Sequence, residues 1–412
     1  MRGRARELSL RVVRRTTRQY VDPGAKVFDD FLVNIRPFDS MRVIIQIARN
    51  ARLLFAVAIV VLPVSDFAAA TPADPGTTSP ESRQAIGAAI GQILQADGPR
   101  AKAYFAQVST RSLSAKDAEF LTCMTRRLDE PAEAPHIVSP ITEKSDDFVD
   151  RVLLLYREYW RQSVSDPAKR PQADSLLVNG LSALLGKPGA TDMPALEPPL
   201  KGALEQRGFH SLQGRTGLLH ELMIWTKEST KVEAVKLPES TNSTTVHYLD
   251  NFVSTGWSSY FTCDRTGTGG WTTDAGLFVV VPGYKSLTDE HFRVNFLDHE
   301  SQHYADYKRF PNLKPWELEY RAKLVELAYA VTTSAKVIGA FQANQGDNPG
   351  DQHSYANRRV IDAVRTRLRI SASVDLTTVP VPRIQRAALS ELYADSARRR
   401  QSEKARAGHA RH

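Results

Sequence analysis

The pentapeptide His299-Glu300-Ser301-Gln302-His303 constrains this 412-residue chain more than any other segment. Histidines four residues apart lie one above the other on the same side of an α-helix, because each helical turn contains about 3.6 residues. Both imidazole rings then reach a single ion at bond lengths near ~2.1 Å. The spacing therefore predicts a helix, from about Asp289 to Lys308, that holds a metal on one face.

Glu300 follows the first histidine directly and precedes the second by three residues. On a helix this places its carboxylate beside the open coordination position, where it can take a proton from water. The motif is short, and a chain of this composition contains one by accident roughly once in a hundred cases. The alternative is that the two histidines lie on the surface, form ordinary hydrogen bonds and bind no metal. A strand before the helix and a candidate third ligand after it favour a metal.

The third ligand is expected on the next helix, which the pattern places from near Trp316 through Val331. A short turn between two antiparallel helices brings the first turns of the second beside the histidines. We predict Glu319 as the ligand, the alternative being a surface pair between Glu319 and Lys323. Glu317 is less suitable because Arg321 is its ready partner four residues on, and Glu326 is better placed to orient a ligand histidine through its free ring nitrogen.

A histidine pair of this kind followed by a glutamate on a later helix resembles the gluzincin branch of the zincin metallopeptidases, over residues 299–326. The resemblance implies Zn²⁺ held by His299, His303 and Glu319, with Glu300 activating water. It also implies that the edge strand of the sheet, expected near Leu277–Val281, pairs with an extended peptide. The Gly-x-Met-x-Asn signature of many gluzincin aminopeptidases is missing, so exopeptidase activity is not implied.

Hydrolysis of an amide also needs a donor to the developing oxyanion. His353 and Tyr355 follow a Gly/Asn/Asp loop at Gln345–Asp351 and begin a third helix. This order is compatible with a transition-state histidine or tyrosine in zincins, and both residues are catalytic candidates beside Glu300. The alternative is a histidine at a helix start and a tyrosine in the core.

The pattern of apolar residues predicts an α+β fold that is predominantly helical. Helical spacing runs to about residue 229, with breaks at the proline-rich segments Pro131–Pro140 and Pro188–Pro199. A small antiparallel sheet follows. We expect a helical domain at 71–205, a zincin-like catalytic domain at 206–397 and a basic tail at 398–412. Four segments exemplify the helices, namely Ala85–Leu94, Ala118–Leu128, Phe148–Trp160 and Leu176–Leu185, and four the strands, namely Val232–Leu237, Thr244–Leu249, Trp257–Cys263 and Leu277–Val281.

Residues 41–70 are organised like a secretory signal peptide, with arginines before an apolar run and Ala68-Ala69-Ala70 at its end. The apolar run Leu53–Val64 is shorter than the roughly 20 residues that span a membrane. We therefore expect cleavage after export, a secreted or periplasmic protein, and no stable membrane span. Residues 1–40 precede Met41 and are interpreted as an upstream extension. An exported location would allow Cys123 and Cys263 to pair, but the sequence leaves their pairing open.

The formal charge of +8 is concentrated at the front of the chain, where residues 1–70 carry 12 Lys and Arg against 6 Asp and Glu. The rest of the chain is nearly neutral, and its basic C-terminus lacks aromatic residues for stacking on bases. We therefore expect no nucleic-acid partner.

The expected partner is a peptide or protein substrate. The alternatives are a zinc hydrolase of a non-peptide amide, such as a cell-wall linkage, and a non-catalytic envelope or binding protein. The oligomeric state stays open.

Overall fold

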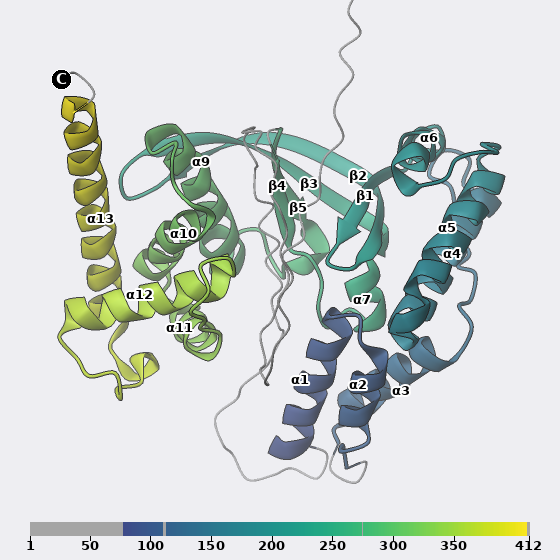
Figure 1. Ribbon diagram of the computed structural model, residues 1–412, viewed down its shortest axis with the longest axis horizontal. Coiled ribbons are helices and arrows are strands. Elements are labelled where there is room, and N and C mark those ends of the chain that lie inside the picture. The colour runs from purple at the N-terminus through teal and green to yellow at the C-terminus, as the bar shows by residue number, and fades with distance from the viewer. Residues whose placement is uncertain (1–76, 110–112, 274, 410–412) are drawn as a thin grey trace, which may run out of the picture.

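A computed structural model describes residues 77–109, 113–273 and 275–409 of the chain (Figure 1). The predicted signal peptide at 41–70 and the extension at 1–40 lie outside these residues. In the described part of the chain, no helix is both long enough and apolar enough to cross a membrane.

Six helices form the N-terminal lobe, which we define as α1 to α6. Polar side chains fix the starts of several of them: the side chains of Ser79, Ser114 and Asp146, for example, each accept a hydrogen bond from the first turn of the helix that follows. Apolar faces of these helices meet around the fully buried rings of Tyr156 and Trp160. The bounds are α1 (Pro80–Leu94), α2 (Gly98–Phe105), α3 (Ala115–Asp129), α4 (Asp147–Ser165), α5 (Arg170–Leu184) and α6 (Met193–Glu205).

The four helical segments expected in this lobe are confirmed by α1, α3, α4 and α5, with α5 ending one residue short of Leu185. The break expected at Pro188–Pro199 is confirmed before Met193 and wrong beyond it, because α6 begins at Met193 and contains Pro198 and Pro199. Both prolines lie beyond the first four residues of α6, so each removes one backbone N–H donor from the helix, which continues nevertheless to Glu205. The expectation of helix to residue 229 is also wrong, since β1 begins at His210.

Five strands form one curled sheet in the order β1-β2-β3-β5-β4. Strands β3 and β5 run parallel and the other neighbouring pairs are antiparallel, so the predicted purely antiparallel sheet is wrong in this respect. The chain leaves β3, forms β4 at the far edge and returns through β5 between them. The bounds are β1 (His210–Thr216), β2 (Leu219–Lys236), β3 (Thr241–Thr255), β4 (Gly270–Thr273) and β5 (Gly276–Val280).

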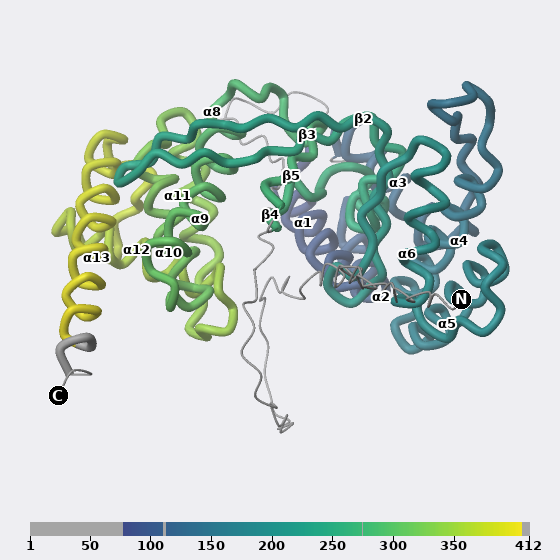
Figure 2. The backbone as a smooth tube through the Cα atoms, turned by 90° about the horizontal axis from the view of Figure 1, so that it is seen from above, coloured from purple at the N-terminus to yellow at the C-terminus, as the bar shows by residue number. Residues whose placement is uncertain are grey.

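The long hairpin of β2 and β3 joins two hydrophobic cores. The first part of β2 contributes Leu219, Leu222 and Ile224 to the core of the N-terminal lobe. The end of β2 contributes Val235, and β3 contributes Val246, to a second core under the C-terminal helices. Figure 2 shows the hairpin arching from one group of helices to the other.

The segment Trp257–Cys263, predicted as a strand, instead begins with the short helix α7 (Trp257–Phe261). Gly256 has φ 95°, a left-handed conformation that turns the chain out of β3, and a Cβ there would lie 2.5 Å from Glu221 Oε1. The same carboxylate oxygen accepts a hydrogen bond from the Trp257 backbone N–H at 3.0 Å. Aromatic and polar residues alternate here, but the turn at Gly256 decides the conformation.

A disulfide bond joins Cys123 on α3 to Cys263 just after α7. Its Cα atoms lie 6.5 Å apart, within the ordinary range for a bridge. The pairing that the sequence left open is therefore made, and it fixes α7 to the N-terminal lobe.

The C-terminal lobe, α8 to α13, packs on the face of the sheet that carries Val246 and Leu277. Its helix α13 includes Arg398 and Arg399, which pair with Glu391 and Asp395, so the segment expected as a basic tail begins inside a helix. The bounds are α8 (Glu290–Phe292), a π-helix (Arg293–Asp298), α9 (His299–Arg309), α10 (Pro315–Tyr329), α11 (Ser334–Ala343), α12 (Gln352–Leu368) and α13 (Val381–His409).

Candidate metal centre

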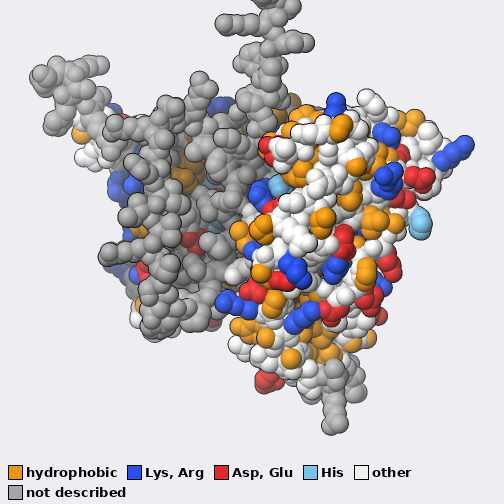
Figure 3. All heavy atoms as spheres, turned by 45° about the vertical axis from the view of Figure 1, so that its right-hand side comes forward, with side chains coloured by type: hydrophobic (Ala, Val, Ile, Leu, Met, Phe, Trp, Pro, Cys, Tyr) orange, Lys and Arg blue, Asp and Glu red, His pale blue; other side chains and the backbone are white. Residues whose placement is uncertain are grey.

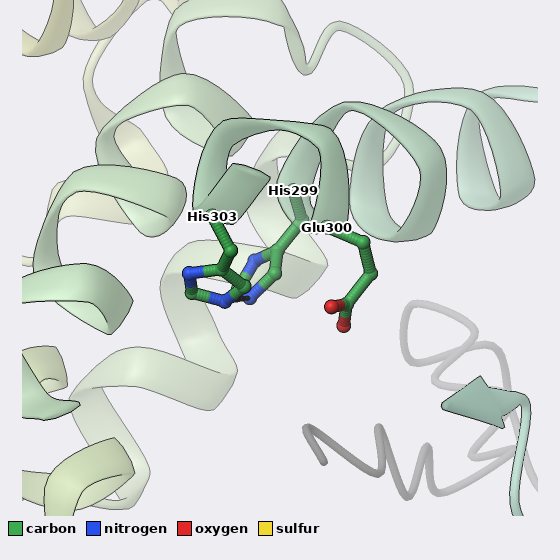
Figure 4. Close-up of side chains that lie close together, drawn as sticks. All are labelled: His299, Glu300 and His303. Atoms are coloured by element: carbon green, nitrogen blue, oxygen red, sulfur yellow. Dashed lines mark hydrogen bonds between the residues drawn. The ribbon is translucent and has the colours of Figure 1, made fainter. Parts of the chain in front are cut away.

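The histidine pair lies at the start of α9, directly after the π-helical segment Arg293–Asp298. A wider helical turn of this kind is rare and occurs often at functional sites. His299 and His303 are both buried, and their Nε2 atoms lie 3.2 Å apart. Figure 4 shows the two rings adjacent on one side of the helix, with the Glu300 carboxylate extending on the same side. Ligand atoms of these three residues lie within 4.8 Å of one another, so the group could hold a metal ion.

Glu319, from α10, brings a carboxylate to the same point. Its Oε1 lies 3.4 Å from His303 Nε2 and its Oε2 lies 3.6 Å from His299 Nε2. A tetrahedral zinc ion bound at about 2.0–2.1 Å separates its ligand atoms by about 3.3–3.4 Å. The separations between the three side chains bracket this value, so two histidines and a carboxylate fit around one ion.

Glu326, two turns further along α10, fixes the orientation of His299. Its Oε1 lies 2.5 Å from His299 Nδ1, and its Oε2 accepts a hydrogen bond from the Asn295 side chain at 3.1 Å. When the ring is neutral, a proton on Nδ1 leaves the lone pair of Nε2 directed at the centre. Burial alone would lower the pKa of His299. The negative charges of Glu326 and Glu319, and the hydrogen bonds of His299 with them, outweigh burial and raise this pKa to about 10.

Glu300 is fully buried and is oriented by β4. The Thr272 hydroxyl donates a hydrogen bond to Glu300 Oε2 at 2.7 Å, while Glu300 Oε1 has no partner among the described residues. Burial raises the pKa of this carboxyl above its ordinary value. One oxygen of Glu300 is therefore held in place, and the other is free to accept a proton.

His353 reaches the centre from the first turn of α12. Its Nδ1 lies 3.0 Å from Glu319 Oε2, and its side chain is 30% exposed, so it faces both the carboxylate and solvent. Tyr355 packs its ring edge-on against Trp316, with the centroids 5.0 Å apart. Of the two candidates for transition-state stabilisation, the structure brings His353 to Glu319 and gives Tyr355 a packing contact.

Lys323 also contacts Glu319, with its Nζ 3.5 Å from Oε2. The sequence suggested this pair as a surface alternative to metal binding, but both side chains are buried. Burial raises the pKa of Glu319, yet the charge of His353 and the close contacts with the three histidines outweigh it and hold the pKa well below its usual range. Glu319 therefore stays ionised.

Three buried carboxylates surround the histidines, namely Glu300, Glu319 and Glu326. Lys323 is a buried cation in contact with Glu319, and the raised pKa of His299 makes its ring a second cation at neutral pH as long as no metal is bound. An imidazole that binds a metal must be neutral. A divalent cation would therefore replace the charge that the proton of His299 supplies.

Two expectations about neighbouring residues are wrong. Glu317 pairs with Arg399 on α13 at 3.0 Å, because Arg321 is fully buried and donates to Asp306 instead. The strand at Leu277–Val281, expected at the edge of the sheet, is β5 and lies between β3 and β4. The edge strand beside the site is β4, which carries Thr272.

Sequence reasoning did not find Thr272 or Asn295 as members of the site, and it placed the pair of Glu319 and Lys323 on the surface. Asn295 precedes the motif by four residues and Lys323 follows Glu319 by four, so helical spacing offered a signal for both. Thr272 lies in another element, and only the pairing of β4 with β5 places it beside Glu300.

Comparison with known proteins adds no family to this geometry. No protein-family model, curated protein sequence or solved structure matches the chain at a significant level.

Proposed function

We propose that this chain is a zinc-dependent hydrolase that cleaves peptide bonds outside the cytoplasm. The observation that carries the proposal is the close approach of His299, His303 and Glu319, at 3.2, 3.4 and 3.6 Å, next to a buried Glu300 that is oriented by Thr272. Two imidazole nitrogens and one carboxylate are the donor set that catalytic zinc sites use, because it leaves a fourth position open. Bound there, zinc would supply Lewis-acid chemistry that polarises a carbonyl group and acidifies water.

The chain's own residues supply the remaining steps. Glu300 would take the proton of the attacking water at its free Oε1, while Thr272 holds Oε2. His353, partly exposed next to Glu319, is the residue best placed to donate a hydrogen bond to the developing oxyanion. Glu326 would keep the Nε2 lone pair of His299 directed at the ion.

The edge position of β4 supports a peptide as the substrate. An extended peptide can add to a sheet edge through backbone hydrogen bonds, and β4 is the edge strand whose Thr272 contacts Glu300. A peptide that pairs with β4 would therefore run close to the proposed base.

Two features support action outside the cytoplasm. The pattern at 41–70 favours export, and the disulfide between Cys123 and Cys263 is of a kind that forms and persists in oxidising compartments.

The deciding experiment measures metal and turnover on the purified full chain. We expect about one zinc per chain, as a three-ligand site implies. His299→Ala should lose the zinc and Glu319→Ala should weaken it, whereas Glu317→Gln, on the same helix but paired with Arg399, should keep it. Glu300→Gln should keep the zinc and lose about 10²–10⁴-fold in turnover of a peptide library.

Each part of the proposal has its own contrary outcome. A chain that purifies without metal and takes up none on addition of zinc would overturn the hydrolase. A zinc-bound chain that cleaves non-peptide amides but no peptide would keep the metal centre and overturn the substrate class.

A further inference from the structure

A cluster of arginines in the N-terminal lobe belongs to no part of the metal centre. Arg126 and Arg127 lie in the last turn of α3, Arg157 lies in α4 and Tyr260 lies in α7. Together with Glu130, Pro131 and Glu133 they line a pocket of about 100 Å³. Figure 3 shows the side of the molecule to which this lobe belongs, where basic and acidic side chains are interspersed among apolar ones.

The guanidinium group of Arg127 lies over the Tyr260 ring, with its carbon 4.3 Å from the ring centroid. This cation–π contact occupies the flat face of the guanidinium and leaves its five N–H donors, which point outward along the edge. In the part of the chain that the structure describes, Nη1 of Arg127 is buried and has no hydrogen-bond partner. Burial lowers the pKa of Arg127 below its ordinary value, because the charged guanidinium is partly removed from water.

Arg157 lies over the same ring, with its carbon 5.4 Å from the centroid. One of its nitrogens donates to the backbone carbonyl of Glu133 at 3.3 Å. Among the described residues, neither Arg127 nor Arg157 forms an ion pair, although exposed Glu130 and Glu133 lie at the same pocket. Two partly buried guanidinium groups therefore converge in the described part of the chain without a salt bridge to either glutamate, although the charges of Asp264 and Glu133 act on them from a greater distance.

The disulfide holds this arrangement in place. Cys123 lies one helical turn before Arg127, and Cys263 lies three residues after Tyr260, so the bridge fixes α3 against α7. Basic residues in the last turn of a helix commonly offset the helix dipole, which accounts for the exposed Arg126. A dipole effect does not require the buried, unpartnered Nη1 of Arg127.

We propose that this pocket is a binding site for an oxyanion, the carboxylate or phosphate group of a small ligand, held between Arg127 and Arg157. The planar fork of a guanidinium matches two oxygens of either group and binds them with charge-assisted hydrogen bonds. The volume of about 100 Å³ admits one such group. The rest of the ligand would lie outside the pocket.

The test is calorimetric titration of the full chain with sodium phosphate and with sodium acetate at constant ionic strength, using sodium chloride as the reference. Each titration is repeated on His299→Ala, because an anion could otherwise bind at the metal centre. We expect one saturable site for at least one of the two anions in both proteins. The anion that binds more tightly identifies the ligand group as phosphate or carboxylate.

Variants then locate the site. Arg127→Gln and Arg157→Gln should each weaken binding at least about tenfold, since each removes charge-assisted hydrogen bonds. Arg151→Gln, exposed on the same helix as Arg157 and outside the pocket lining, should change it less than about twofold. Reduction of the disulfide should also weaken binding.

The proposal would be overturned if neither phosphate nor acetate bound more tightly than chloride. It would also be overturned if Arg157→Gln bound the anion as tightly as the native chain does. Circular dichroism and thermal unfolding in chloride check that each variant folds. If Arg127→Gln does not fold, Arg157→Gln decides the outcome alone.

Discussion

His299 Nδ1 and Glu326 Oε1 lie 2.5 Å apart, so the first histidine of the motif is tied to a carboxylate two turns beyond the expected ligand Glu319. The contact sets which ring nitrogen of His299 faces the centre. It also links the two helices that carry all three expected ligands.

We predict that Glu326→Gln weakens zinc binding by about 10–100-fold, the usual effect of removing a carboxylate that orients a ligand histidine. Competition with a chromogenic chelator measures the affinity. Glu317→Gln, on the same helix and paired with Arg399, should leave the affinity unchanged. Equal affinities in Glu326→Gln and the native chain would show that the contact does not orient His299.

Thr272→Val should lower kcat for the proposed peptide hydrolysis by about tenfold or more, because Glu300 Oε2 loses the hydroxyl that orients it in a buried position. Zinc content should not change. Thr272→Ser keeps the hydroxyl and should restore most of the rate. A valine variant with native kcat would mean that Glu300 is oriented by other contacts.

Arg321→Leu should destabilise the fold by about 3–5 kcal/mol, since it leaves buried acidic partners without their cation. Arg321 donates to Asp306 and Asp395 at 2.8 Å and to Glu239 at 3.1 Å, and so connects α9, α13 and the β2–β3 turn. Urea unfolding measures the change. Arg386→Leu, exposed on α13, should stay within about 0.5 kcal/mol of the native chain, and a similar small loss at Arg321 would refute the prediction.

Glu221 should make the fold less stable as pH rises. Burial raises the pKa of Glu221 to about 7, against an ordinary 4.5. Below pH 4.5 the carboxyl is protonated in both the folded and the unfolded chain. Between these two values the unfolded chain gives up the proton first, so stability falls as pH rises, by about 3 kcal/mol in total, and is lowest above pH 7.

Glu221→Gln tests this because it removes the titration and keeps a carbonyl oxygen for the Trp257 N–H. The free energy of unfolding of the variant, minus that of the native chain, should therefore be larger at pH 8 than at pH 4.5. A difference that is the same at both pH values would contradict the assigned pKa.

The pattern of apolar residues within a segment was sufficient to predict most helices and parts of the two long strands. Phe148–Trp160 lies inside α4, and Thr244–Leu249 lies inside β3, because the period of apolar residues records which side of an element is buried. The prediction of a strand failed at Trp257–Cys263, where the left-handed conformation of Gly256 and the buried carboxylate of Glu221 on β2 favour a helix. Neither cause is visible within the segment.

The sequence by itself determined that His299 and His303 share one helical face, since four residues make about one turn. It also determined that Glu319 and Glu326 lie on the following helix, and the role of Glu319 as a ligand stays a prediction. Only the tertiary structure decided that both carboxylates reach the histidines, that Lys323 is buried with them, and that β4 brings Thr272 to Glu300. The reason is physical: periodicity fixes which face of an element is buried, whereas the packing of α10 on α9 and the order of strands fix which faces meet.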